Sequence, residues 1–350
     1  MGSEPIFVVG AGRSGTTMLQ LMLNAHPNIA IIGELHYFDT IQQIQKWVPE
    51  LNSPGSIDKF KYYLRRCEHY SLIPFMDELV DCVCERLVDA PLPSYEKFYQ
   101  FIMEEYAVRQ SASRFGEKTP ANVRYLDELL QIFPDAKIVH LVRDPRAVAA
   151  STVKMPGASR NVLIHALSWK YDILLGRYAK ERAAYIEVRY EDLVQYPREE
   201  LKRITAFIGE NYDEHMLNFH KSASKFLKNE PWKDGTKEPV NAAPIDKWKQ
   251  QLTPSETLVV ESVSGSVMDK FNYMKTIHGF WRSFSVPIVL SLELVHYGIH
   301  RIHKYWRNAV TGKKDGVPTI YSERKKLYRK VLKTMAVSVV NVFFSRKGRQ

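Results

Sequence analysis

The chain has 350 residues, 45% hydrophobic and 25% charged, which is the composition of a globular protein rather than a disordered or fibrous one. Its three cysteines cannot form a disulfide framework and have no zinc-ligand spacing, so we expect a reduced, cytoplasmic protein without a metal site. The net charge of +10 comes from the end of the chain, because residues 301–350 hold 14 Lys/Arg and two acidic residues. The acidic remainder and the lack of any nucleic-acid motif argue against nucleic-acid binding.

The first predicted strand, residues 6–9, runs into a turn with three glycines and then into an apolar helical pattern. This strand–loop–helix order directs backbone N–H groups and a helix N-terminus at an anion. The Walker pattern G-x-x-x-x-G-K-[ST] fits from Gly10 to Gly15 and at Thr17, but Thr16 replaces the lysine. Since that lysine normally reaches the β/γ-phosphates, we expect a phosphate-like anion here without ordinary triphosphate chemistry.

The next elements alternate between strands and helices. Strands are predicted at 29–32, at a strand end near 115–118, at 137–142 and at 184–188, and helices at 123–133, 162–182 and 197–208, with a helical, aromatic-rich stretch at 37–112. Such alternation predicts an α/β fold with a mainly parallel sheet and helices on both faces. Ligands bind beyond the carboxyl ends of such strands, so the glycine loop, Glu34, Lys118 and Arg143 are expected around one cleft.

A second anion-binding element follows the strand at 137–142. Arg143 emerges at the strand end, Asp144 and Pro145 are suited to begin a helix, and Ser151 lies about two turns into it. An arginine fork and a hydroxyl at this separation can hold one phosphate from two sides. By itself the segment fits a helix that starts beside a solvated arginine better than it fits a phosphate clamp.

Together these segments resemble the sulfotransferases that use 3′-phosphoadenosine-5′-phosphosulfate (PAPS), closest to the tyrosylprotein and bacterial branches, over residues 5–255. The segment similar to the family's 5′-phosphosulfate loop consists of Gly12, Arg13, Ser14, Gly15, Thr16 and Thr17. Arg143 with Ser151 looks like the 3′-phosphate clamp, and Tyr190 matches a residue near the adenosine. The resemblance implies a P-loop-like three-layer fold and metal-free transfer of a sulfuryl group to a hydroxyl or amine, releasing adenosine 3′,5′-bisphosphate.

The resemblance also implies catalytic residues. Glu34 stands where several branches carry a catalytic glutamate, and His36 is the alternative base, because another branch uses a histidine in that neighbourhood. Arg13 is expected to stabilise the leaving phosphate, and Lys118 matches a lysine near the transferred sulfate, although a solvated loop lysine is an equal alternative. Lys237 lies in a stretch similar to the family's donor-capping loop.

We expect a sulfotransferase domain at 1–275, with an acceptor-side insertion at 37–112, and a basic helical C-terminal extension at 276–350. The extension combines an apolar face with a basic one over 319–344, which favours peripheral contact with an anionic membrane or packing on the domain. The acceptor stays open among small molecules, carbohydrates and lipids. The other hypotheses are a kinase-like P-loop phosphotransferase and a non-catalytic, membrane-docking nucleotide-binding protein.

Overall fold

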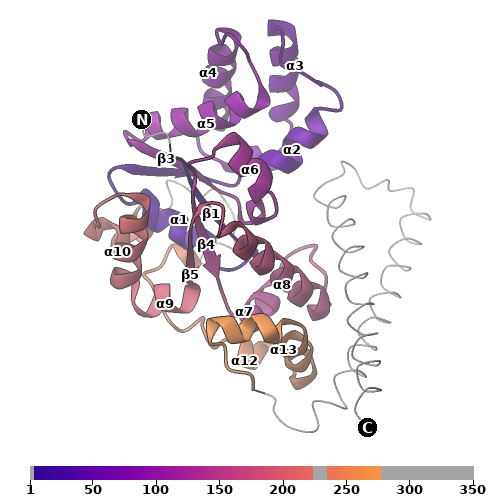
Figure 1. Ribbon diagram of the computed structural model, residues 1–350, viewed down its shortest axis with the longest axis vertical. Helices are drawn as coiled ribbons and strands as arrows, with labels where there is room; N and C mark the ends of the chain where they lie inside the picture. The colour runs from indigo at the N-terminus through magenta and orange to yellow at the C-terminus, as the bar shows by residue number, and fades with distance from the viewer. Residues whose placement is uncertain (1–3, 224–234, 277–350) are drawn as a thin grey trace, which may run out of the picture. The chain divides into compact units, whose positions relative to one another are not determined.

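A computed structural model describes residues 4–223 and 235–276, and the structural findings concern these residues. At its centre is a parallel sheet of five strands in the order β2-β3-β1-β4-β5. The strands are β1 (Ile6–Gly10), β2 (Ile29–Ile32), β3 (Arg114–Lys118), β4 (Lys137–Val142) and β5 (Ala184–Arg189). Because all five run in the same direction, their carboxyl ends meet at one edge of the sheet (Figure 1).

The central strand β1 shows why both faces of the sheet are covered. Every residue from Ile6 to Val9 is fully buried, and successive side chains point to opposite faces. Phe7 and Val9 belong to one hydrophobic core, whereas Ile6 and Val8 belong to another. A strand that is apolar on both faces has to be sandwiched between two layers of helices.

The helices form those two layers. The core that contains Ile6 and Val8 includes residues of α1 (Thr16–Asn24), α9 (Tyr190–Gln195), α10 (Pro197–Ile208) and the 3₁₀ segment η3 (Glu214–Lys221). The core that contains Phe7 and Val9 includes residues of α2 (Tyr37–Ile44), α3 (Pro54–Leu64), α4 (Met76–Val88), α5 (Tyr95–Arg109), α6 (Leu126–Ile132) and the 3₁₀ segments η1 (Glu68–Leu72) and η2 (Pro120–Arg124). A smaller cluster joins α7 (Pro145–Thr152), α8 (Val162–Ala179), α13 (Pro254–Met268) and η5 (Asp269–Phe271), and the short α12 (Trp248–Gln251) precedes α13.

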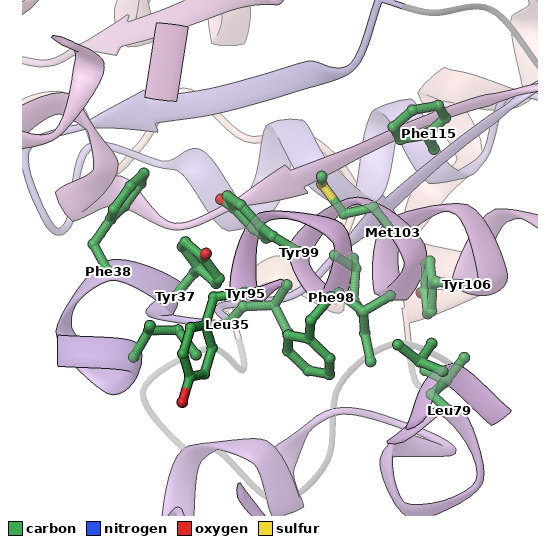
Figure 2. Close-up of a cluster of buried hydrophobic side chains, with 14 of the residues drawn as sticks. Leu35, Tyr37, Phe38, Leu79, Tyr95, Phe98, Tyr99, Met103, Tyr106 and Phe115 are labelled. Carbon is green, nitrogen blue, oxygen red and sulfur yellow. The ribbon is translucent and has the colours of Figure 1, made fainter. Parts of the chain in front are cut away.

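The insertion between β2 and β3 consists of α2 to α5, which Figure 1 shows grouped together, away from α7, α12 and α13. Its core is aromatic: Tyr37 of α2 stacks on Tyr99 of α5, with ring centroids 3.9 Å apart and planes 3° from parallel. Figure 2 shows this pair beside Phe38, Tyr95 and the other buried side chains of the cluster. The insertion is packed against the sheet through α5, whose Tyr99 ring also lies 6.0 Å from the ring of Phe7 in β1.

The predicted α/β fold with a parallel sheet and two helical layers is confirmed. The helix expected at 123–133 is interrupted, because Tyr125 (φ −122°, ψ 23°) leaves the helical region between η2 and α6. Within residues 4–223 and 235–276 there is no helix long and apolar enough to cross a membrane and no group of side chains suited to hold a metal ion. The C-terminal extension lies outside the described residues, apart from Thr276.

Candidate active site

The glycine loop between β1 and α1 has the backbone of an anion cradle. Gly15, directly before α1, has φ 94°, and Arg13 has φ 70°, a left-handed conformation that costs energy for a side chain other than glycine. A Cβ on Gly15 would lie 2.5 Å from the Tyr190 ring, so only glycine fits there. The turn therefore exposes backbone N–H groups at the start of α1, where the helix dipole favours a negative charge.

Several buried polar atoms at this edge of the sheet lack a hydrogen-bond partner within the part of the chain that the structure describes, among them His36 Nδ1 and Arg189 Nε, and two of these atoms belong to the predicted anion-binding elements. Ser14 Oγ in the loop is fully buried without a hydrogen bond, and so is Nε of Arg143, at the end of β4. Buried polar groups are normally satisfied, so these two atoms fit a bound oxyanion. Their residues follow the carboxyl ends of the neighbouring strands β1 and β4, as expected for two separate anion contacts.

Arg143 is held in place from several sides. Its Nη1 donates to the Arg13 carbonyl (3.1 Å), its Nη2 donates to the Pro244 carbonyl (3.3 Å), and its guanidinium lies 4.2 Å from the centre of the Tyr190 ring. Arg13 Nε in turn donates to Ser151 Oγ over 3.1 Å. Arg143 and Ser151, predicted as one clamp, are therefore joined through Arg13, which links both anion-binding elements.

The helix after Arg143 starts as predicted. The carboxylate of Asp144 accepts from the N–H of Arg146 (2.8 Å), and Pro145 is the first residue of α7. Arg146 also bonds to Glu261 of α13 (2.8 Å), so the start of α7 is fixed to a distant helix. Ser151 lies in the last turn of α7, so the position of this helix places its hydroxyl within hydrogen-bond distance of Arg13.

On the other side of β1, three predicted catalytic residues are in contact. Lys118 is the last residue of β3, and its Nζ lies 2.5 Å from Glu34 Oε1 and 3.3 Å from Thr17 Oγ1. Glu34 Oε2 lies 3.3 Å from His36 Nε2. The Lys118 side chain is 1% exposed, so the solvated loop lysine considered from the sequence is not what the structure has. The ammonium instead lies beside the glycine loop, although the Walker lysine itself is missing.

Two histidines beside Glu34 differ in their affinity for protons. Burial disfavours the charged form of His36, but its hydrogen bond to Glu34 and the charges of Glu34, Glu117 and Asp39 raise its pKa above the usual value. Burial together with the charge of His36 lowers the pKa of His69 to about 4. The two rings pack edge to face with centroids 5.2 Å apart. Near neutral pH His69 is therefore uncharged, whereas His36 holds a proton more strongly than a free imidazole.

The structure adds a residue that the sequence analysis missed. Glu117, directly before Lys118, is fully buried; its Oε1 accepts from the Leu35 N–H (3.1 Å), and Thr119 Oγ1 also donates to it. Thr119 Oγ1 accepts in turn from the His36 N–H (3.2 Å). A buried carboxylate inside a predicted strand is the signal that could have identified it, because buried charges are rare without dedicated partners. Glu117 and Thr119 thus fix the two backbone N–H groups that directly follow Glu34.

Most of the predicted residues therefore gather at one edge of the sheet. On the Lys118 side, contacts join four residues: Thr17, Glu34, His36 and Lys118. On the Arg143 side, contacts join four others: Arg13, Arg143, Ser151 and Tyr190. The loop residues between the two groups are Gly12, Ser14, Gly15 and Thr16. Lys237 is exposed, and its role as a donor-capping residue stays a prediction.

A glycine loop with the backbone of an anion cradle, a buried arginine beside it and a carboxylate–lysine pair are together typical of a group-transfer enzyme of the P-loop-like class. The model of the Sulfotransferase family matches residues 5–214, and the chain belongs to this family. The prediction of a sulfotransferase, an enzyme that transfers a sulfuryl group, is thereby confirmed.

Individual relatives are distant. The chain is 25% identical to the protein-tyrosine sulfotransferase of Drosophila melanogaster over 71% of its own length but only 47% of that protein's length. It is 23% identical to the omega-hydroxy-beta-dihydromenaquinone-9 sulfotransferase Stf3 of Mycobacterium bovis, over 78% of this chain and 76% of the relative. The sulfotransferase domain of the Synechococcus PCC 7002 olefin synthase superposes with a TM-score of 0.52 and 26% identity, covering 75% of this chain and 95% of the domain.

Proposed function

We propose that the sulfuryl donor is PAPS, with its 5′-phosphosulfate on the glycine loop and its 3′-phosphate on Arg143 and Ser151. The observation that carries this proposal is the pair of buried, unpartnered polar atoms on neighbouring strands, Ser14 Oγ and Arg143 Nε. A donor with a single phosphate group would satisfy one of these sites and leave the other empty. PAPS carries an anion at each end of its ribose and so matches both.

In the proposed reaction, the acceptor oxygen attacks sulfur as the bond from sulfur to the bridging oxygen breaks. The electron pair of that bond stays on the departing 5′-phosphate, and the acceptor proton passes to Glu34. Arg13 and the loop N–H groups stabilise the negative charge that grows on the leaving phosphate, and Lys118 neutralises the sulfuryl oxygens. Such prepositioned donors are usually the largest contribution to catalysis.

Glu34 is the proposed base because it lies between Lys118 on the donor side and His36 on the insertion side. His36, the alternative base, has a raised pKa and lies 3.3 Å from Glu34, so in its protonated form it stabilises the Glu34 carboxylate instead of taking up a further proton. Both residues precede α2, so the acceptor hydroxyl would arrive from the insertion, α2 to α5.

For the acceptor we propose a hydroxyl group. The names of the two relatives above specify a protein tyrosine and an omega-hydroxy menaquinone derivative, and both of these acceptors carry a hydroxyl. Small molecules, carbohydrates and lipids remain within this class. The cytoplasmic location and the peripheral contact of the C-terminal extension with anionic membranes remain part of the proposal. All three cysteines are free, which agrees with a reducing compartment.

The donor is tested by thermal unfolding with adenosine 3′,5′-bisphosphate, adenosine 5′-phosphate and ATP–magnesium. A ligand that binds only the folded state adds about 2.7 kcal/mol of stability at 100 times its Kd. We expect the bisphosphate to raise Tm most, and Arg143→Ala to remove its advantage over adenosine 5′-phosphate. Arg198→Ala, at an exposed arginine of α10, is the matched control and should keep that advantage. An equal shift with ATP–magnesium would point to a phosphotransferase instead.

A further inference from the structure

Lys118 is shared between the donor side and the acceptor side of the site. Its ammonium lies against Thr17 of the glycine loop and, more closely, against Glu34, the proposed base. The side chain is almost fully buried, so water screens neither contact strongly. Lys118 thus contacts both the loop that would hold the donor and the carboxylate that would take the proton of the acceptor.

Glu34 is held more firmly in its place than a loop residue usually is. The following residue, Leu35, donates its N–H to the buried Glu117, and the N–H of His36 is held by Thr119. His36 adopts a left-handed backbone (φ 46°, ψ 39°), and its ring contacts the second oxygen of Glu34. The backbone around Glu34 is therefore fixed, whereas the ammonium stands at the end of a long, rotatable side chain.

An anion in the glycine loop changes the balance at Lys118. Thr17 lies at the start of α1, where the loop would hold the phosphosulfate, so donor oxygens would come within reach of the ammonium. Charge-assisted hydrogen bonds to phosphate or sulfuryl oxygens are as strong as those to a carboxylate, and the donor brings several such oxygens. The Lys118 ammonium would turn toward the donor, and Glu34 would keep its position and lose its contact with Lys118.

We propose that donor binding draws Lys118 away from Glu34, so that Glu34 becomes an effective base only when the donor is in place. The inference rests on the proposed function and adds a coupling between its two halves. No covalent bond changes in this step: Lys118 keeps its proton and exchanges one anionic partner for another. Before the donor arrives, the ion pair keeps the Glu34 carboxylate bound to Lys118.

The titratable groups around Glu34 and its neighbour His36 agree with such a change. Lys118 comes from β3 together with the buried Glu117, His36 precedes α2 and Asp39 lies within it, and His69 comes from η1. With Lys118 turned away, His36 stays beside Glu34 and is a cation when it is protonated. Because Glu117 and Asp39 are acids and His69 is neutral near pH 7, the released Glu34 carboxylate would bind a proton more readily.

The test is a double-mutant cycle on the binding of adenosine 3′,5′-bisphosphate, measured by titration calorimetry without acceptor. Glu34→Gln removes the competing carboxylate, so we expect the bisphosphate to bind about fivefold more tightly. Lys118→Met should weaken binding, and adding Glu34→Gln to Lys118→Met should bring no further gain. Asp39→Asn, which removes a nearby negative charge that bonds to Tyr125, is the matched control and should change affinity by less than about twofold.

A gain from Glu34→Gln of the same size with and without Lys118 would overturn the coupling, since it would reflect only the general charge of the cleft. A second measurement uses the unmodified side chains, in case Lys118→Met does not fold. The pKa of the Glu34 carboxylate, followed by carbon-13 NMR, should rise by about one unit or more when the bisphosphate is bound. An unchanged pKa would contradict the coupling, whereas a failure of the wild-type protein to bind the bisphosphate would contradict the proposed donor instead.

Discussion

The carboxylate of Glu117 connects several segments of the chain at a single point. Besides Leu35 and Thr119, it accepts hydrogen bonds from Tyr99 Oη (2.8 Å) and Asn122 Nδ2 (2.5 Å). Burial raises the pKa of this carboxyl, and its hydrogen bonds offset part of that effect. The donors come from the β2–α2 loop, from α5 and from η2, so one side chain ties the insertion to the strand that carries Lys118.

We expect Glu117→Leu to lower the free energy of unfolding by about 2–4 kcal/mol, because several buried donors would lose their acceptor. Urea denaturation measures this loss. Glu117→Gln keeps the shape and one acceptor oxygen and should cost less. A loss below about 1 kcal/mol for the leucine variant would show that the donors find other partners, and that Glu117 does not organise the site.

At the scale of elements, the junction of β1 with α1 depends on the glycine at its end. Gly15 combines a left-handed backbone with the Tyr190 ring close to its α-carbon, whereas a Cβ on Gly12 would have no atom within 4 Å. The two glycines of the loop therefore differ in how much space a side chain would have. There is room for a Cβ at Gly12, whereas at Gly15 a Cβ would clash with Tyr190, the first residue of α9.

The difference predicts opposite outcomes for the same substitution. Gly15→Ala should lower the free energy of unfolding by about 1–3 kcal/mol, because it strains the backbone and displaces Tyr190. Gly12→Ala should leave stability within about 0.5 kcal/mol, and it serves as the matched control. Chemical denaturation of the two variants without ligand makes the comparison. Equal effects would mean that the turn does not depend on the contact with Tyr190.

At the scale of the whole molecule, buried histidines link stability to acid. His140 of β4 is fully buried and shares a hydrogen bond of 2.5 Å with Tyr185 of β5. Burial, with a smaller effect from the charge of Arg177, lowers its pKa to about 3, and the pKa of His69 is about 4. Both histidines are neutral in the folded protein and take up a proton at higher pH when it unfolds. Their contribution is present above pH 6.5 and is lost as the pH falls toward 4.

We therefore expect the free energy of unfolding to fall by about 1.4 kcal/mol per pH unit for each of these histidines once the pH is well below 6.5. His36, with its raised pKa, acts in the opposite direction: its contribution is present below pH 6.5 and is lost at higher pH. Urea denaturation between pH 7 and pH 4.5 measures the slope. His140→Gln should flatten it, and an unchanged slope in that variant would exclude His140 as a source of acid sensitivity.

Local sequence patterns predicted most of the sheet because β1, β2 and β4 are mainly apolar runs that end at a turn signal, whereas β3 and β5 carry charged residues among the apolar ones. The position of Lys118 could not be predicted in this way, because its contact with Thr17 joins residues 101 positions apart in the chain. The same holds for Glu117, whose partners become neighbours only after the insertion has packed. The pairing of Arg13 with Ser151 in place of Arg143 depends on the left-handed turn at Arg13, which residue types alone do not reveal.

The strand order fixes both the spacing and the order of the predicted anion-binding residues along the edge of the sheet. The loop leaves β1, Arg143 leaves the neighbouring β4, and Lys118 leaves β3 on the opposite side. Neighbouring strands are about 4.8 Å apart, so the spacing between these anion contacts is set by backbone hydrogen bonds rather than by flexible side chains. The two anions of the proposed donor would therefore be held at a spacing and in an order that the sheet sets. A changed insertion could admit a different acceptor without altering that spacing.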